Sequence, residues 1–285
     1  MADETTRARP AIELSLRSVA VLSAASVAGL IMLLWPLFFA PAEDQQRVDQ
    51  PFIFIVLLPV VVLVVLAEIS QGGMDSKALA MLGVLTAINA ALRPIGAGTA
   101  GIEMVFFMLI LGGRVFGPGF GFVLGCTSLF ASALLTAGVG PWLPFQMLCS
   151  AWIGMFAGFL PKRVTGKAEI AMLVAYGIVA AYAFGLIMNF TSWPFTLGIA
   201  IPGETDGLSM VPGDPPLENL QRFLVFTALT SLWGWDTGRA ITNTVMILLL
   251  GPAVLATLRR AARRARYLPA ETSGNEDETR DEPAH

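Results

Sequence analysis

The chain has 285 residues, of which 55% are hydrophobic and only 14% are charged, and its mean hydropathy is +0.69. Soluble domains have about 45–50% apolar and about 25% charged residues, so this composition excludes a soluble enzyme, a disordered protein and a nucleic-acid-binding module. The net charge is −3, and the single histidine, His285, is the last residue. Zinc sites built from histidines, histidine triads and histidine proton relays are therefore excluded.

The N-terminal part contains two apolar runs that predict a pair of membrane helices. Residues 18–40 follow three arginines and are longer than the hydrophobic region of a signal peptide, about 7–15 residues, so they predict a retained helix. A polar loop leads to the second run, residues 52–69. Residues 18–69 are thus predicted to form a transmembrane hairpin, preceded by a cytoplasmic segment at 1–17.

Six further apolar runs follow, bounded by Gly, Pro or basic residues that are typical of helix ends. They cover residues 78–92, 102–113, 119–138, 143–160, 169–198 and 239–258. A polar loop with four acids occupies 201–221, and the stretch 222–235 is too mixed in polarity to assign. Residues 259–285 begin with RRAARRAR and continue as an acidic tail, and we expect this basic and acidic region to be disordered.

Lys and Arg residues are distributed unevenly between the two sides of these eight predicted helices. With the N-terminus in the cytoplasm, fourteen of the 18 lie on the cytoplasmic side. Only Arg47, Arg93, Arg222 and Arg239 lie on the outer side. Because cytoplasmic loops of membrane proteins are enriched in Lys and Arg, both termini are predicted to be cytoplasmic. The chain is predicted to be an all-α, multi-pass protein of the cell membrane.

Small residues recur every four positions in several of the predicted helices. Gly83, Ala87 and Ala91 form one such set. Gly117, Gly121 and Gly125 form another, and Gly154 and Gly158 a third. Residues four apart share one helix face, where small side chains let another helix approach closely. The pattern allows two interpretations, which are packing inside the bundle and docking of a second membrane protein.

Polar and aromatic residues gather toward the outer ends of the helices, while ionisable residues at mid-depth are scarce. The residues concerned are Asn89, Arg93, Glu103, Trp142, Gln146, Asn189, Trp193, Trp235, Asp236, Arg239 and Asn243. Tryptophan can stack on a ligand, amides can hydrogen-bond it and arginine can meet an anionic group, so this set is a candidate substrate-binding site. An outer aromatic belt and a structural ion pair between Asp236 and Arg239 are the alternative interpretations.

Four stretches together carry a resemblance to a known family. They are KALAMLGVLTAINAALRPIGAGTAGIE (77–103), GGRVFGPGFGFVLG (112–125), GVGPWLPFQML (138–148) and WDTGRAITNTVMILLLGPAVLATLRRAARR (235–264). Over residues 77–258 the chain resembles the substrate-binding (S) component of energy-coupling factor (ECF) transporters of the actinobacterial type. The resemblance implies a six-helix membrane core that binds a vitamin or related micronutrient from the outside.

The resemblance also implies partners and the division of labour among them. It implies a membrane coupling (T) subunit and two cytoplasmic ATPase subunits that hydrolyse ATP, so that this chain is not an enzyme and has no catalytic residues, metal or cofactor of its own. It assigns Gly83, Ala87 and Ala91 to contact with the coupling subunit. The hairpin at 18–69 is an addition before the six-helix core, and the loop at 201–221 either covers the site or simply connects helices.

Two other function classes compete with this interpretation. An integral-membrane enzyme acting on lipid-linked substrates would use Glu103, Asp236 and Arg239 at the outer interface, although no histidine or closely spaced carboxylate pair supports it. A secondary transporter is disfavoured by the scarcity of charge at mid-membrane depth. The substrate stays open among a cobalamin-type compound, a thiamin-related pyrimidine and riboflavin.

Overall fold

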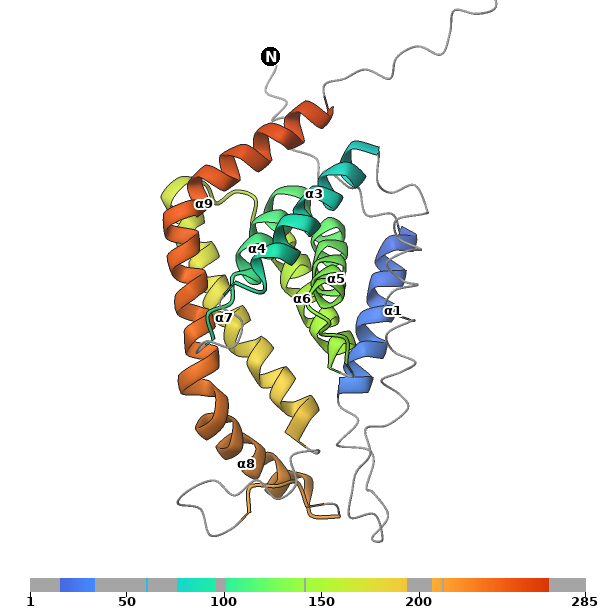
Figure 1. The fold of residues 1–285 in the computed structure, drawn as a ribbon, viewed down its shortest axis with the longest axis vertical. Helices are drawn as coiled ribbons and strands as arrows, with labels where there is room; N and C mark the ends of the chain where they lie inside the picture. The colour runs from blue at the N-terminus through green and yellow to red at the C-terminus, as the bar shows by residue number, and fades with distance from the viewer. Residues whose placement is uncertain are drawn as a thin grey trace, which may run out of the picture.

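The computed structural model describes residues 16–33, 60, 76–95, 101–140, 142–193, 207–211 and 213–266. Every regular element in these ranges is a helix (Figure 1). The α-helices are α1 (Leu16–Leu33), α3 (Ser76–Leu92), α4 (Val105–Phe116), α5 (Pro118–Leu135), α6 (Leu143–Phe159), α7 (Gly166–Ser192), α8 (Pro216–Thr227) and α9 (Thr237–Arg266). A π-helix, η3 (Ala228–Asp236), joins α8 to α9.

The prediction of an all-α membrane protein is confirmed for the described part of the chain. Residues 118–135, 166–192 and 216–263 form helical segments long and apolar enough to cross a membrane, and shorter apolar helices accompany them. The predicted run 52–69 lies outside the described residues, apart from residue 60. The count of eight membrane helices and the position of both termini stay predictions.

Helices α4, α5 and α6 form the most densely packed part of the bundle. Gly121 of α5 and Gly154 of α6 lie so close that a Cβ atom on either would collide with the backbone of the other. Gly125 and Gly158 are likewise closed in by backbone from the facing helix. These glycines therefore serve packing inside the bundle, where small residues let two helix backbones touch.

The first helix packs on the outside of α6. The indole Nε1 of Trp152 donates a hydrogen bond to Ser26 Oγ at 3.0 Å. One turn further along α1, Gly29 lies against the side chain of Leu148. The described half of the predicted hairpin thus covers α6 and leaves α3 on another side of the bundle (Figure 1).

The C-terminal third of the chain differs from the sequence prediction in two regions, before α9 and at the end of α9. Residues 216–221 were expected in a loop and 222–235 were unassigned, but α8, η3 and α9 form one continuous helical segment. Pro216 occupies the first turn of α8, where a missing N–H costs nothing. Helix α9 continues to Arg266, so 259–266 is helical rather than disordered, since Ala and Arg are strong helix formers.

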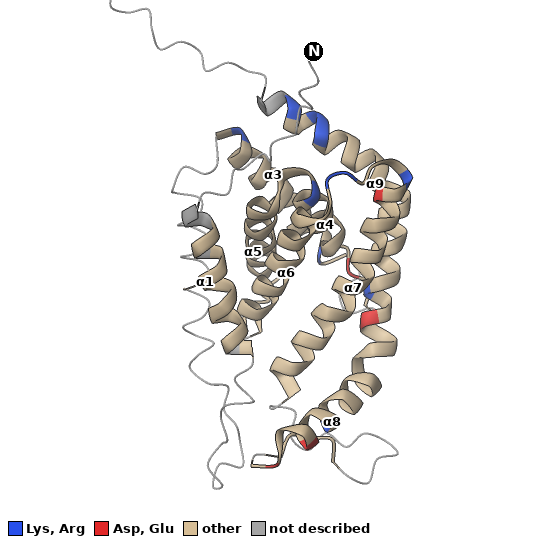
Figure 2. Ribbon diagram, turned by 180° about the vertical axis from the view of Figure 1, so that it is seen from behind, with Lys and Arg blue, Asp and Glu red and all other residues tan. Residues whose placement is uncertain are grey.

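Most of the Lys and Arg residues in the described part of the chain lie at one end of the bundle, which we call the basic end (Figure 2). It comprises the start of α3, the end of α4, the connection between α6 and α7 and the last turns of α9. Its residues are Lys77, Arg114, Lys162, Arg163, Lys167, Arg259, Arg260 and Arg263. The enrichment of basic residues in cytoplasmic loops predicts that this end faces the cytoplasm.

Candidate functional site

A pocket of about 290 Å³ lies where several helices end, away from the basic end. It is formed by the end of α3, the segment before α4, the end of α5, the start of α6 and the junction of η3 with α9. Five of the residues predicted from sequence line it: Arg93, Glu103, Trp142, Trp235 and Arg239. Residues up to 146 positions apart in the chain meet here because each helix reverses direction at this side of the bundle.

Arg239 is the centre of an ionic cluster at one wall of the pocket. Its Nε donates to Glu103 Oε2 at 2.6 Å, and its Nη1 donates to Asp236 Oδ1 at 2.8 Å. Asp236 is 1% exposed, and Ser231 Oγ donates to its second oxygen at 2.7 Å. The guanidinium also lies 5.0 Å from the centre of the Phe184 ring, a cation–π distance. This cluster fixes the position of Arg239 and joins α9 to the start of α4.

Arg93 also lines the pocket and lies just after the last turn of α3. Its Nη2 donates to Gln146 Oε1 on α6 at 2.8 Å. Gln146 therefore lies beside the pocket and fixes the position of the Arg93 guanidinium by this hydrogen bond. Two predicted site residues are thus brought together by a hydrogen bond between neighbouring helices.

Two tryptophans supply the aromatic part of the pocket. Trp142 precedes α6 and is 49% exposed, and Trp235 belongs to η3 and is 41% exposed. Large apolar side chains that stay half exposed beside a pocket can cover a ligand with their ring faces. The pocket therefore combines aromatic surface, two guanidinium donors and a carboxylate acceptor, which together suit one small polar ligand.

Several buried polar groups near the pocket have no hydrogen-bond partner among the described residues. The Ser132 hydroxyl lines the pocket and is fully buried. Asn89, one turn before Arg93, has both side-chain atoms unpaired, and Asn243, one turn after Arg239, has an unpaired Oδ1. Buried polar groups are normally paired, and of these three residues Ser132 is the one that lines the pocket.

Two predicted site residues lie elsewhere. The Nε1 of Trp193 donates to the backbone oxygen of Leu208 at 2.7 Å, and its ring packs on Phe223 of α8. Asn189 lies one turn before Trp193 on the same helix and is not among the residues that line the pocket. Trp193 therefore stabilises the packing of α7 against α8.

Conversely, the pocket contains residues that sequence reasoning missed. Ser132 lies in the last turn of α5, Thr136 caps the C-terminal end of this helix, and Gly138 follows it. The break in hydrophobicity at TAGVG, residues 136–140, is a signal that could have indicated the last two. Ser132 sits inside an apolar run, where a single serine carries no signal.

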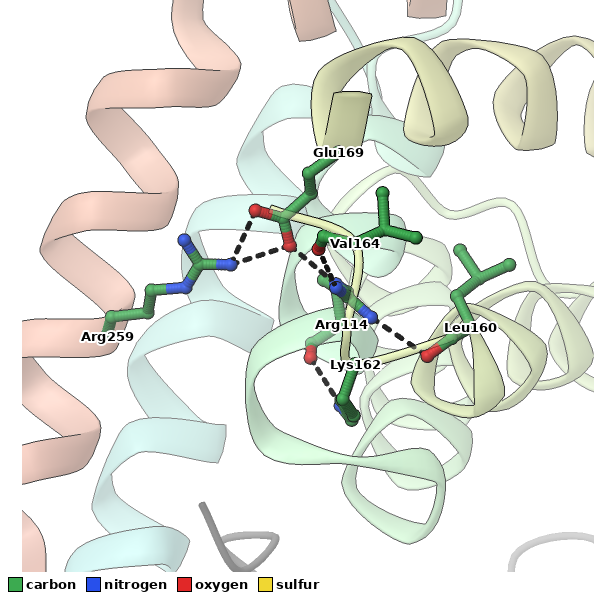
Figure 3. A network of polar contacts seen from close by, with 6 residues as sticks. All are labelled: Arg114, Leu160, Lys162, Val164, Glu169 and Arg259. Atoms are coloured by element: carbon green, nitrogen blue, oxygen red, sulfur yellow. Dashed lines mark hydrogen bonds and ion pairs between the residues drawn. The ribbon is translucent and has the colours of Figure 1, made fainter. Parts of the chain in front are cut away.

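A second polar network closes the basic end (Figure 3). Arg114 Nε lies 2.6 Å from Glu169 Oε1, and both side chains are 2% exposed. Arg259 of α9 donates from Nη2 to both oxygens of Glu169, at 2.6 and 2.7 Å. Arg114 also donates to the backbone oxygens of Leu160 and Val164 at 2.8 and 2.9 Å. The network therefore ties α4, α7, α9 and the α6–α7 connection together.

Lys162 is the outermost member of this network. Its Nζ donates to the backbone oxygen of Arg114 at 2.8 Å. Burial of the ammonium, followed by repulsion from the guanidinium groups of Arg114 and Arg259, lowers the pKa of Lys162 to about 8, although Glu169 opposes the shift. Lys162 is thus a titratable group close to physiological pH at the basic end.

The small residues of α3 have different surroundings from those of α5 and α6. Gly83, Ala87 and Ala91 are exposed, and a Cβ atom on Gly83 would meet nothing within 4 Å. Beside this face, an apolar groove of about 370 Å³ runs between α3 and the C-terminal half of α9, with Val84, Ile88 and Val254 among its lining residues. The exposed face and the groove leave room for another helix on this side.

Comparison with known proteins identifies the family. A family model described as "ECF transporter, substrate-specific component" matches residues 77–258, which is more than half of the chain. The chain belongs to this family. No curated protein and no solved structure matches the chain. The resemblance read from the sequence is confirmed at the level of the family and over the same residues.

Membership in the family assigns the general role of the molecule. A substrate-specific ECF component is a substrate-binding transport subunit and a multi-pass protein of the plasma membrane, not an enzyme. The alternatives of a lipid-modifying enzyme and a secondary transporter are therefore disfavoured. The match begins at residue 77, so the predicted hairpin at 18–69 precedes the part that the family describes.

Proposed function

We propose that this chain captures a vitamin-like molecule on the outer side of the plasma membrane for import driven by ATP hydrolysis in separate subunits. The pocket between Arg93, Trp142, Trp235 and Arg239 is the observation that carries the proposal. It lies away from the basic end, which is predicted from the distribution of Lys and Arg to face the cytoplasm. A ligand would therefore enter from outside.

The dimensions of the pocket favour a compact substrate. Its volume of about 290 Å³ is at the lower limit of ligand sites, about 300–1,000 Å³. Such a volume suits a molecule with one ring system and disfavours a cobalamin-type compound. Ring stacking on Trp142 and Trp235 would supply apolar contact, and Arg93 and Ser132 would supply the polar contacts.

We propose that the exposed face of α3 docks the membrane coupling subunit, which in turn joins the two ATPases. Gly83, Ala87 and Ala91 form a flat surface on which a partner helix can approach closely. The adjacent groove toward α9 would take the larger apolar side chains of that partner. The same face is free of the internal contacts that occupy the glycines of α5 and α6.

The capture function can be tested on the protein purified in mild detergent. We expect native mass spectrometry to show a retained small molecule, and Trp235→Ala to lose it. Trp233→Ala is the matched control, because Trp233 lies on the same π-helix, is 79% exposed and does not line the pocket. Absence of a bound molecule, together with no thermal stabilisation by any of a panel of vitamins, would contradict the proposed function.

A further inference from the structure

The two arginines of the pocket differ in how their charges are neutralised. Arg239 is held by two carboxylates, at 2.6 Å from Glu103 and 2.8 Å from Asp236. Arg93 donates instead to the neutral amide oxygen of Gln146. A guanidinium paired with two carboxylates attracts a further anion weakly, because its positive charge is already compensated. A neutral amide partner does not compensate the charge of a guanidinium. Attraction for an anionic ligand is therefore concentrated at Arg93.

The two carboxylates of the cluster, Glu103 and Asp236, are already hydrogen-bonded within the protein. Glu103 lies within electrostatic range of Arg93, but its hydrogen bond goes to Arg239. Asp236 is buried and accepts hydrogen bonds from Arg239 and Ser231. A cationic ligand would have to compete with Arg239 for either carboxylate. The charge distribution of the pocket therefore favours an anion over a cation.

Ser132 provides a second, independent observation. Its hydroxyl is fully buried, lines the pocket and has no partner among the described residues. A buried hydroxyl without a partner costs free energy, and a ligand oxygen would remove that cost by accepting its hydrogen bond. Ser132 and Arg93 line the same pocket.

We infer that the pocket selects a small ring compound carrying one anionic group, a carboxylate or a phosphate, which is bound by Arg93 and the Ser132 hydroxyl while the ring lies between Trp142 and Trp235. The inference rests on the proposed capture function and names its substrate class. Sites that hydrogen-bond a substrate group discriminate strongly against an analogue that lacks it. Ser132 and Arg93 are thus the specificity-determining residues of the pocket.

The test compares anionic and neutral members of matched pairs by thermal stabilisation and by binding in detergent. The pairs are nicotinate with nicotinamide, biotin with biotinamide, and pyridoxal 5′-phosphate with pyridoxal. We expect at least one anion to bind and its neutral counterpart to bind at least about 10-fold more weakly. The carboxylate and phosphate members distinguish the two kinds of anionic group. Tighter binding of a neutral member, or no binding of any anion, overturns the inference.

Variants of the chain sharpen this comparison. Arg93→Gln is expected to weaken binding of the anion about 10- to 100-fold, and Ser132→Ala about 3- to 10-fold. Ser128→Ala is the control, because Ser128 is a buried, unpaired serine one turn away on α5 that does not line the pocket. Equal effects of Ser132→Ala and Ser128→Ala would contradict the role of Ser132, even if Arg93→Gln did not fold.

Failure of the inference can be told apart from failure of the proposed function. A neutral or cationic molecule that co-purifies with the protein and is lost in Trp235→Ala would support capture and overturn the anionic class. If no molecule co-purifies, no member of the three pairs binds and no vitamin of the panel stabilises the protein, both the inference and the proposed function fail.

Discussion

Arg114 and Glu169, 55 positions apart in the chain, form an ion pair of 2.6 Å that is almost completely buried at the basic end. Each of the three guanidinium nitrogens of Arg114 donates a hydrogen bond, one to Glu169 and two to backbone oxygens of the α6–α7 connection. A buried charge is tolerated only when it is paired and hydrogen-bonded in this way. The pair therefore fixes the end of α4 against the start of α7.

Removing Arg114 is expected to destabilise the protein strongly. Among the described residues, Arg114→Leu leaves the buried Glu169 carboxylate with the half-exposed Arg259 as its remaining ion-pair partner, and breaking a buried ion pair costs about 3–5 kcal/mol. The free energy of unfolding in detergent measures the loss. Arg222→Leu is the control, because the partly exposed pair of Arg222 with Asp214 contributes about 0–1 kcal/mol. Similar losses of unfolding free energy in the two variants would contradict the stabilising role of the buried Arg114–Glu169 pair.

Lys162 makes the stability of the folded protein depend on pH in the alkaline range. Its pKa of about 8 in the folded protein is below the ordinary value of 10.5, so the folded state gives up this proton first. The penalty for the charged ammonium is present below about pH 8 and is relieved as the pH rises toward 10.5. The side chain is exposed enough for solvent to screen the effect, so we expect a shallow slope.

The difference in melting temperature between the natural protein and Lys162→Gln, measured from pH 7 to 11, isolates this contribution. We expect the natural protein to gain stability relative to the variant between about pH 8 and 10.5. Lys167→Gln, at another exposed lysine of the basic end, serves as the control. A difference that stays constant or falls across this range would rule out the lowered pKa.

The sequence was sufficient to predict the helical fold, because the apolar runs are long and clearly bounded. It also predicted about half of the pocket residues, because polar residues at helix ends face one another once consecutive helices reverse direction. Arg93, Glu103 and Arg239 were found by this reasoning, since ionisable residues are rare in such a chain and stand out. Trp193 was assigned to the same group on equal grounds. It lies elsewhere because the Leu208 backbone and Phe223, far along the chain, provide it with partners.

Identical patterns in the sequence proved to have different surroundings. Gly83 and Gly121 both belong to sets of small residues four apart, yet one is exposed and the other touches the backbone of α6. Which face of a helix meets a neighbour depends on tertiary packing, which a four-residue period does not encode. The ion pair of Arg114 with Glu169 was missed for the same reason, since each residue alone is typical of a helix end.

This contrast predicts opposite effects of adding a single methyl group. Gly121→Ala forces the α5 and α6 backbones apart and is expected to cost about 1–3 kcal/mol of unfolding free energy. Gly83→Ala adds a methyl group where nothing lies within 4 Å, and is expected to stabilise the exposed helix by about 0.5–1 kcal/mol. Unfolding of the two variants in detergent provides the measurement. A loss in Gly83→Ala equal to that in Gly121→Ala would show that the α3 face is packed inside the bundle.

Docking of the coupling subunit on α3 can be separated from ligand capture by a larger substitution. Ala87→Leu places a branched side chain in the middle of the exposed small-residue face, where it would hold a partner helix away. We expect this variant to fold and bind ligand normally but to fail to co-purify with the coupling subunit and the ATPases. Ala87 is not among the residues that line the pocket, the first of which along the chain is Arg93, just after α3.

The matched control for this experiment is Ala175→Leu, which makes the same change at an exposed alanine of α7. It adds the same apolar surface to the membrane-facing side of the protein, so it accounts for changes in expression and detergent behaviour. We expect Ala175→Leu to form the complete complex. If Ala87→Leu also forms it, the α3 face is not the docking surface; if both variants fail, the loss has a cause other than the shape of α3.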